Sequence, residues 1–202
     1  DVCSSDLVFN TKVTEELVEQ KKPDVLLIAA GSIEKRPNVP GIEKDKVSTA
    51  VEVLSGAKKT GNTVLMVGGG LVGCETALWL AQSGRDVTVV EALDNILSAG
   101  KPVPHMNKTM LIDLMNQYKV KTITSNCLLE VTDDGAVLIS NTFRKQTVKA
   151  DSVVISIGFS SNNGLYEKVH MKVDDVYLIG DAENASNIMD AIWSANEVAL
   201  NI

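Results

Sequence analysis

Three glycines that follow a predicted buried strand could bind a pyrophosphate. Gly68, Gly70 and Gly73 have the G-x-G-x-x-G spacing. An apolar run at 63–67 precedes them, and apolar residues at helical intervals follow over 71–83. In such a turn the backbone can approach a pyrophosphate, and the unpaired N–H groups of the helix N-terminus face its charge. The alternative is a tight strand-to-helix turn that binds nothing. The predicted phosphate cradle comprises Gly68, Gly69, Gly70, Leu71, Val72 and Gly73.

An acidic residue after the next strand completes this pattern. Residues 87–90 read as a short apolar strand, and Glu91 follows it. It stands about 20 residues past the glycines, where an acid binds the two hydroxyls of an adenosine ribose. A carboxylate there would repel a 2′-phosphate, and Ala92, Leu93 and Asp94 add no positive charge to offset the repulsion. The sequence therefore predicts a βαβ unit that binds NADH in preference to NADPH.

The segments after this unit predict the elements that hold it in place. An amphipathic helix begins near Pro104, and a third parallel strand covers 120–124. Two apolar runs on either side of Asp133-Asp134-Gly135 predict a hairpin, and 142–150 reads as a third antiparallel strand. Residues 151–157 then form a buried strand. This order predicts an α/β fold, a Rossmann-like dinucleotide-binding domain with a parallel sheet and an antiparallel three-strand ribbon.

Several side chains that could do chemistry are expected to be structural instead. Cys74 is expected to be a small packed residue, and Trp193 to pack in a core. His105 and His170 have no partner at metal-ligand or triad spacing, so we expect both to lie on the surface, and we assign no metal ligand and no catalytic residue in this chain. Glu75 could be an acid that the dipole favours at the helix N-terminus. A four-residue repeat predicts a core stripe: Met106, Met110, Leu114 and Tyr118.

The two ends of the chain predict a second, smaller group of elements. Residues 7–10 read as a strand remnant, and 14–22 as a short helix with a threonine N-cap. The apolar run 24–30 is typical of a central parallel strand covered on both faces. A strand over 176–179 ends in a Gly-Asp pair. The last helix, 188–200, has one apolar face: Ile188, Ala191, Ile192, Ala195 and Ala199.

Composition favours an ordinary globular protein with small-molecule ligands. The 202 residues are 45% hydrophobic and 22% charged, with a formal net charge of −7 and scattered basic residues. We therefore expect no nucleic-acid or anionic-membrane partner. No apolar run reaches the roughly 18 residues needed to span a bilayer. The cysteines, Cys3, Cys74 and Cys127, lie far apart without a C-x-x-C pair, so a reducing cytoplasm fits best.

The first seven residues do not fit the elements that follow them. DVCSSDL suits neither the strand nor the helix after it, and it matches one translation frame of a common sequencing-library adapter. We therefore expect residues 1–7 to be a non-native segment and the native polypeptide to begin upstream of Val8. Cys3 would then have no biological role.

Four stretches of this sequence carry a family resemblance. DVLLIAAGSIEKRPNVPGI, GGGLVGCETALWLAQSGRDVTVVE, MLIDLMNQYKVKTITSN and VYLIGDAENASNIMDAIWSANEVA together resemble the C-terminal half of the NADH:flavin oxidoreductases of the 2,4-dienoyl-CoA reductase and enoate reductase group. The resemblance covers the chain from Phe9 to its end. It implies a partial, discontinuous FAD-binding domain over 8–42 and 160–202, with an NADH-binding domain inserted at 43–159.

The resemblance also implies further cofactor-binding residues. Ala30 and Gly31 match a turn near the flavin nucleotide, although an alanine stands where the group has a threonine hydroxyl. Gly180 and Asp181 match a Gly-Asp motif whose carboxylate binds a ribityl hydroxyl of FAD. For Asp181 the alternative is a cap on the last helix or its turn. Gly158 matches a position that lines the nicotinamide cleft. The resemblance also gives an alternative for two other residues: Glu75 would contact the nicotinamide ribose, and Trp193 would pack under the flavin.

The resemblance places the rest of such an enzyme outside this chain. The first βαβ unit of the FAD domain, a flavin barrel with FMN and a cysteine cluster for an iron–sulfur centre would lie before Val8. The leading hypothesis is an electron-input module that passes hydride from NADH to FAD, and onward to a reductase of activated C=C bonds. One alternative is the NAD(P)H domain of a pyridine nucleotide–disulfide oxidoreductase or NADH oxidase. The other is a non-catalytic domain that holds ADP or AMP.

Overall fold

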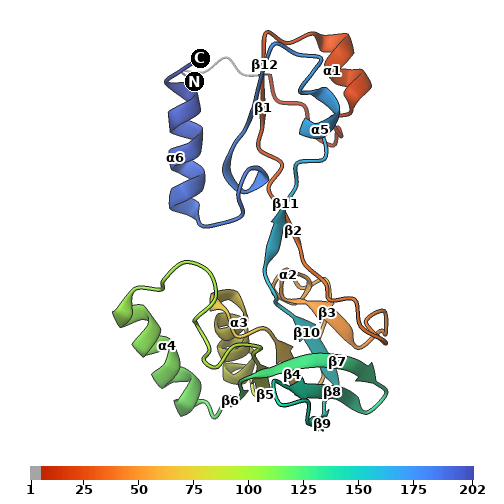
Figure 1. The fold of residues 1–202 in the computed structure, drawn as a ribbon, viewed down its shortest axis with the longest axis vertical. Helices are drawn as coiled ribbons and strands as arrows, with labels where there is room; N and C mark the ends of the chain where they lie inside the picture. Colours follow the sequence, from red (N-terminus) through yellow and green to blue (C-terminus); the bar gives the residue numbers. More distant parts are fainter. Residues whose placement is uncertain (1–5) are drawn as a thin grey trace. The chain divides into compact units, whose positions relative to one another are not determined.

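The computed structural model describes residues 6–202, which form two compact units (Figure 1). The second unit is the continuous segment Glu34–Phe159. The first unit is discontinuous, because it is built from the chain before this segment and from Ser160–Ile202 after it. The two passages between the units form short strands, β2 (Ser32–Glu34) and β11 (Phe159–Ser161), which pair with each other. Cys3 and the rest of 1–5 lie outside the described residues.

The second unit contains a five-stranded parallel sheet in the order β3-β10-β4-β5-β6. Its central strands are apolar on both faces, and Leu65 and Met66 are fully buried. The parallel strands expected around the glycine motif and after it are therefore confirmed, as is the Rossmann-like fold class. The strands are β3 (Val47–Thr49), β4 (Thr63–Val67), β5 (Asp86–Val90), β6 (Lys121–Ile123) and β10 (Ser152–Ile155).

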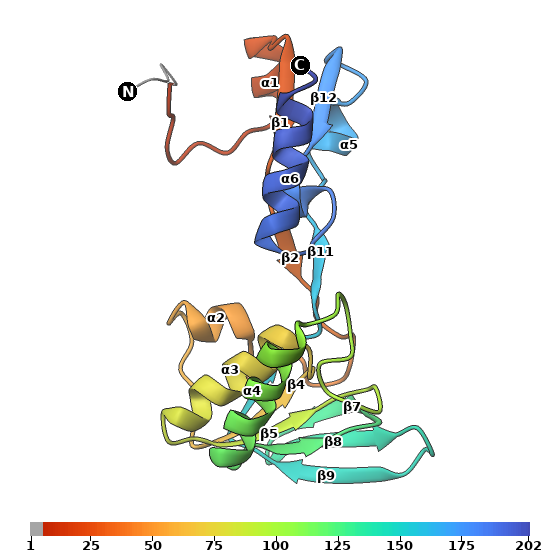
Figure 2. The same ribbon diagram turned by 90° about the vertical axis from the view of Figure 1, so that its left-hand side faces the viewer.

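Helices cover one face of this sheet, and an antiparallel ribbon covers the other (Figures 1 and 2). On the helix side Met66 and Val89 pack against α2 (Ala50–Leu54), α3 (Leu71–Gln82) and α4 (His105–Gln117). On the other side Leu65 and Val153 pack against the ribbon, where Leu138 is fully buried. The ribbon confirms the expected hairpin and third strand, as β7 (Asn126–Thr132), β8 (Gly135–Ser140) and β9 (Lys145–Lys149).

Residues 34–42, expected in the FAD-binding part, belong to the second unit. Glu34 accepts hydrogen bonds from the Thr49 hydroxyl at 2.6 Å and from the Val51 amide at 3.1 Å. Val39 and Ile42 pack against the ribbon side of the core. The observed boundary follows these contacts and differs from the boundary at 42/43 that the resemblance implied.

The core stripe expected on α4 is wrong. Met106 is 75% exposed and Met110 59% exposed, whereas Leu111 and Met115 are buried in the core. A strict four-residue repeat advances by about 40° per step around a helix with 3.6 residues per turn, so it cannot stay on one contact face. Of the four expected residues, Leu114 packs against the core.

The first unit is built on a two-stranded parallel sheet of β1 (Val25–Ile28) and β12 (Asp175–Leu178). The helices α1 (Glu15–Lys21) and α5 (Tyr166–Val169) lie on one face, and α6 (Ile188–Ala199) lies on the other (Figures 1 and 2). Thr14 caps α1 as predicted, with its hydroxyl accepting from the Leu17 amide at 3.4 Å. Leu27 is 43% exposed, so β1 is not the fully covered central strand that its apolar run predicted.

Three further expectations for this unit are wrong. Residues 7–10 form no strand, because Phe9 and Asn10 are in a turn and Asn10 has φ +53°. Trp193 is 65% exposed and lies in no core. On α6 the expected apolar face does not pack as a whole, since Ile188 and Ile192 are exposed. The half-buried positions are Asp190, Ala191, Ser194, Ala195 and Val198.

Candidate functional site

The glycine motif and Glu91 meet at one edge of the parallel sheet of the second unit. Gly68 follows β4, Glu91 follows β5, and Ser156 follows β10. The chain leaves β4 toward β5 on one side, and β10 pairs with β4 on the other. Ligands of open α/β sheets bind at the carboxyl ends of the strands where the strand order reverses in this way. The sheet topology therefore brings the predicted cradle and the predicted ribose acid together.

The glycines of the motif have different structural reasons to be glycine. Gly68 has φ +110°, and a Cβ there would lie 2.1 Å from the carbonyl oxygen of Ser156. A Cβ on Gly73 would lie 2.0 Å from the carbonyl oxygen of Gly68, so only glycine lets α3 approach the turn. Gly70 differs, because no steric neighbour among the described residues comes within 4 Å of a Cβ built there. Its missing side chain leaves open space.

The N-terminus of α3 is suited to an anion. Its N-cap is Gly70, and no side chain of the described residues caps it by a hydrogen bond. The first turn carries no acidic residue. Glu75 lies beyond that turn and is exposed. The first backbone N–H groups of a helix have no partner within the helix and carry the positive end of its dipole, so this end can receive a phosphate.

Glu91 is buried beside the cradle and is bound to it. One carboxylate oxygen, Oε2, accepts from the Gly69 amide at 2.6 Å, and Oε1 accepts from the Leu93 amide at 2.9 Å. The residue is 7% exposed. An ionised carboxylate has about four acceptor positions, so each oxygen can still accept from a ribose hydroxyl. The sequence predicted the place of Glu91 but not its bonds to the backbone.

Gly69, which lies between the first two glycines of the motif, is held through both of its backbone polar groups. Its N–H is held by Glu91, while its carbonyl accepts from the Leu97 amide at 2.7 Å and from the Cys74 thiol at 3.3 Å. These three contacts fix the backbone of Gly69 beside the cradle. Leu97 was missed by the sequence reasoning, and a lone leucine in a loop gives no signal that could have revealed it.

Gly158 lies at the same sheet edge, just beyond β10. It has φ +96°, it is exposed, and within residues 6–202 no steric neighbour lies within 4 Å of a Cβ built on it. Its carbonyl accepts from the Lys35 amide at 2.9 Å. The structure thus leaves open backbone at this position, where the resemblance places the nicotinamide cleft.

Cys74 is buried, and we expect its thiol to be unreactive in the folded protein. Burial, followed by the nearby carboxylates of Glu91 and Glu75, raises the pKa of this thiol to about 12. At pH 8 roughly one thiol in ten thousand would be ionised. Iodoacetamide at pH 8 should therefore modify the exposed Cys127 first. Peptide mass mapping of native and urea-unfolded samples checks this, and equal labelling of both cysteines in the native sample would contradict it.

In the first unit, the flavin-turn and Gly-Asp residues follow neighbouring strands. Ala30 and Gly31 follow β1, whereas Gly180 and Asp181 follow β12 and form a short 3₁₀ helix with Ala182, η1 (Gly180–Ala182). Gly31 has φ +72°, with no steric neighbour within 4 Å of a Cβ built there. The parallel pairing of β1 with β12 brings all four residues to one sheet edge.

Asp181 organises the loop before α6 rather than capping that helix. Its Oδ1 accepts from the Ser186 amide at 3.1 Å, and its Oδ2 accepts from the Ser32 hydroxyl at 3.2 Å. The α6 cap is Asn187, whose side chain accepts from the Asp190 amide at 2.9 Å. Asp181 therefore stabilises this turn, and its carboxylate has further acceptor positions that a ribityl hydroxyl of FAD could use.

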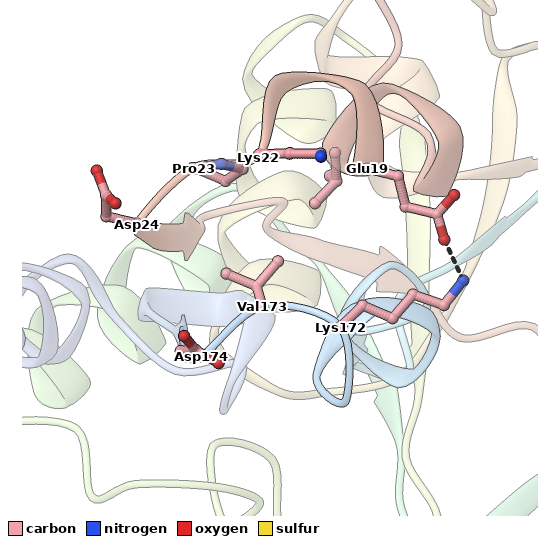
Figure 3. A pocket seen from close by; sticks show the side chains of 8 residues that line it. Glu19, Lys22, Pro23, Asp24, Lys172, Val173 and Asp174 are labelled. Atoms are coloured by element: carbon pink, nitrogen blue, oxygen red, sulfur yellow. Dashed lines mark hydrogen bonds and ion pairs between the residues drawn. The ribbon is translucent and has the colours of Figure 1, made fainter.

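A cavity of about 480 Å³ in the first unit lies away from these residues (Figure 3). It is bordered by Asp24, which precedes β1, and Asp174, which precedes β12, so it lies at the amino ends of the strands. Cofactors bind at the carboxyl ends. The Lys172 ammonium at its rim is held by Glu15 and Glu19. The cavity is lined by Val18, Glu19, Lys22, Pro23, Asp24, Lys172, Val173 and Asp174.

The two histidines and the acidic residues form no metal centre in the described part of the chain. Across 6–202, no group of three or more His, Cys, Asp or Glu side chains could hold a metal ion. His170 stacks on Tyr166 with 5.2 Å between the ring centroids, and His105 begins α4. Within the same residues, no helix has the length and apolar character to cross a membrane.

Comparisons with known proteins identify the family. The chain matches the family described as pyridine nucleotide-disulphide oxidoreductase over residues 4–202. It is 42% identical to a cinnamate reductase of Clostridium sporogenes over 98% of this chain, and 33% identical to an NADH oxidase of Thermoanaerobacter brockii over 93%. A solved structure of a 2-naphthoyl-CoA reductase with 2-naphthoyl-CoA superposes with a TM-score of 0.86 and 30% identity over 96% of this chain.

The chain spans 29% of the length of each of these relatives. The relatives confirm the resemblance to enoate reductase-type flavoproteins, and they confirm the class of oxidoreductase domain. This chain belongs to the pyridine nucleotide-disulphide oxidoreductase family.

Proposed function

We propose that this chain is the electron-input module of a flavin-dependent reductase, binding NADH in its second unit and contributing to an FAD site in its first. One observation carries the proposal. A glycine turn, open at Gly70, stands beside the buried Glu91 carboxylate at the switch point of a parallel sheet. The family and the named reductases among the relatives support this role.

In the proposed complex, each part of the site binds one part of NADH. The first N–H groups of α3 donate to the pyrophosphate, which reaches the backbone through the space beside Gly70. The free acceptor positions of Glu91 take the two adenosine ribose hydroxyls. The open backbone at Gly158 lies where the nicotinamide would extend. NADH would supply a hydride, and the chain's task is to orient it.

The first unit has residues that suit part of an FAD molecule. Gly31 offers unobstructed backbone, and Asp181 offers carboxylate oxygens at the end of the adjacent strand. FAD, when bound, would accept two electrons as hydride and release them onward. A two-stranded sheet presents only an edge of such a site, so we expect this chain alone to bind FAD weakly.

The remainder of the proposed enzyme is longer than this chain. The relatives extend well beyond the matched segment, and we propose that the full-length protein adds a flavin barrel with FMN, an iron–sulfur cluster and the rest of the FAD domain. The similarity to a cinnamate reductase supports an activated C=C bond as the final electron acceptor. The similarity to an NADH oxidase supports dioxygen as the second candidate.

Calorimetric titration of this chain tests the nucleotide site. We expect NADH to bind at least about tenfold more tightly than NADPH, because Glu91 meets the 2′-phosphate with a buried negative charge. Comparable affinities for NADH and NADPH would contradict the proposal that Glu91 binds the adenosine ribose. A titration with ADP tests the alternative of a non-catalytic domain that holds ADP or AMP. ADP binding as tightly as NADH would favour that alternative. Absence of NADH binding would overturn the proposed function.

A further inference from the structure

A buried leucine in an unusual backbone conformation closes a ring of hydrogen bonds beside the cradle. Leu97 has φ +55° and is 5% exposed. The left-handed region is costly for a leucine and persists where surrounding contacts hold it. The Leu97 amide donates to the Gly69 carbonyl, the Gly69 amide donates to Glu91, and Glu91 also accepts from Leu93. The segment from 91 to 97 therefore returns to the glycine turn.

The other side of Leu97 is bound by a lysine from α4. Lys108 is half-buried in the first turn of that helix, and its Nζ donates to the Leu97 carbonyl at 3.2 Å. Both backbone polar groups of Leu97 are thus engaged, one by Lys108 and one by Gly69. A continuous chain of hydrogen bonds runs from the Lys108 ammonium through Leu97 and Gly69 to the Glu91 carboxylate.

Lys108 is the member of this series of hydrogen bonds that a substitution can test. The other links are backbone groups, or Glu91 itself, which the proposed function already uses. A charged donor makes a stronger hydrogen bond than a neutral one, and a partly buried site screens it less than open solvent does. Removal of this donor leaves the Leu97 carbonyl without its ammonium partner and weakens the hold on the left-handed backbone.

We propose that Lys108 is a positioning residue for NADH, an inference that rests on the proposed function. It holds Leu97 so that the Leu97 amide fixes Gly69, and Gly69 in turn aims the Glu91 carboxylate at the ribose. The residue itself does not touch the nucleotide. Its contribution is pre-organisation, which raises affinity by removing the cost of ordering the site on binding.

The test compares Lys108→Met with the wild-type chain by calorimetry and by amide hydrogen exchange. Methionine keeps an unbranched apolar stem and removes the donor. We expect the Kd for NADH, and the Kd for AMP, to rise about fivefold, the effect of one lost hydrogen bond. Without ligand, exchange of the Leu97 amide should become several-fold faster, a readout that does not depend on nucleotide binding.

Two further variants separate positioning from stability. Lys121→Met is the matched control, because Lys121 pairs with Asp86 at the amino end of β5, and it should leave both readouts unchanged. Lys108→Arg keeps a charged donor and should bind NADH within about twofold of wild type. An unchanged Kd in Lys108→Met, or equal weakening in Lys108→Arg, would overturn the inference alone. A wild-type chain that fails to bind NADH would overturn the proposed function and this inference with it.

Discussion

Replacement of Gly73 by alanine is expected to abolish NADH binding and to destabilise the second unit by about 3 kcal/mol. Alanine is intrinsically the better helix former by about 1 kcal/mol, so helix propensity predicts the opposite sign. The steric term outweighs it, because the new Cβ would stand 2.0 Å from the Gly68 carbonyl oxygen. Backbone must then move at the turn that forms the cradle. Thermal unfolding and NADH calorimetry measure the two effects.

Gly70→Ala is the matched control three residues earlier. In the described part of the chain, no steric neighbour lies within 4 Å of a Cβ at this position, and its φ of −71° suits alanine. We expect less than about 1 kcal/mol of destabilisation, the scale of an N-cap change. NADH binding should still weaken about tenfold or more, since the methyl group occupies the space proposed for the pyrophosphate. Normal NADH affinity in Gly70→Ala would show that the pyrophosphate does not lie against Gly70. A fully stable Gly73→Ala would refute the steric argument.

The elements around the glycine motif could be predicted because their signals are local. The turn needs glycine where φ is positive at Gly68 and where two backbones touch at Gly73, and both constraints are visible as residue types at fixed spacing. The parallel strands appear as apolar runs because both faces are covered. Glu91 was predictable for the same reason, since its distance along the chain from the motif reflects one helix and one strand.

The contacts that hold the site could not be predicted in this way. The bond from Leu97 to Gly69 joins two backbone groups, and any residue type can make it. Lys108 resembles any other helical lysine in the sequence. These contacts depend on the path of the loop after β5, which no residue pattern specifies. The contacts that fix Gly69 and Leu97 therefore become visible only in three dimensions.

The errors on the helices have a common physical origin. The α4 repeat and the apolar α6 face were assigned from hydrophobicity alone, yet Met110 and Ile192 are exposed. Burial of a helix face depends on what lies against it as well as on its composition. On α6, the small Ala191 lies close to Gly180, with its Cβ 3.3 Å from a Cβ built on that glycine. Small side chains that permit close approach mark this contact better than large apolar ones.

Glu91→Gln is expected to change both the affinity and the cofactor preference, although the two side chains have nearly the same shape. Glu91 accepts from two backbone amides, one at each carboxylate oxygen. Glutamine has one oxygen and one NH₂ group, so in either orientation the NH₂ faces a backbone donor. In a site that is 7% exposed, this leaves an unsatisfied donor and costs about 2 kcal/mol of stability.

The same substitution should weaken NADH binding about tenfold or more and weaken NADPH binding less, because the negative charge that repels a 2′-phosphate is gone. The ratio of the two Kd values, measured by calorimetry at constant salt, should therefore move toward one. Asp86→Asn is the control, since this exposed acid lies at the amino end of β5, at the opposite end of the strand from Glu91, and pairs with Lys121 at 2.9 Å. It should leave the ratio unchanged. If instead Glu91→Gln preserves the wild-type ratio while binding both nucleotides, discrimination lies elsewhere, and Glu91 serves to hold Gly69 and Leu93 alone.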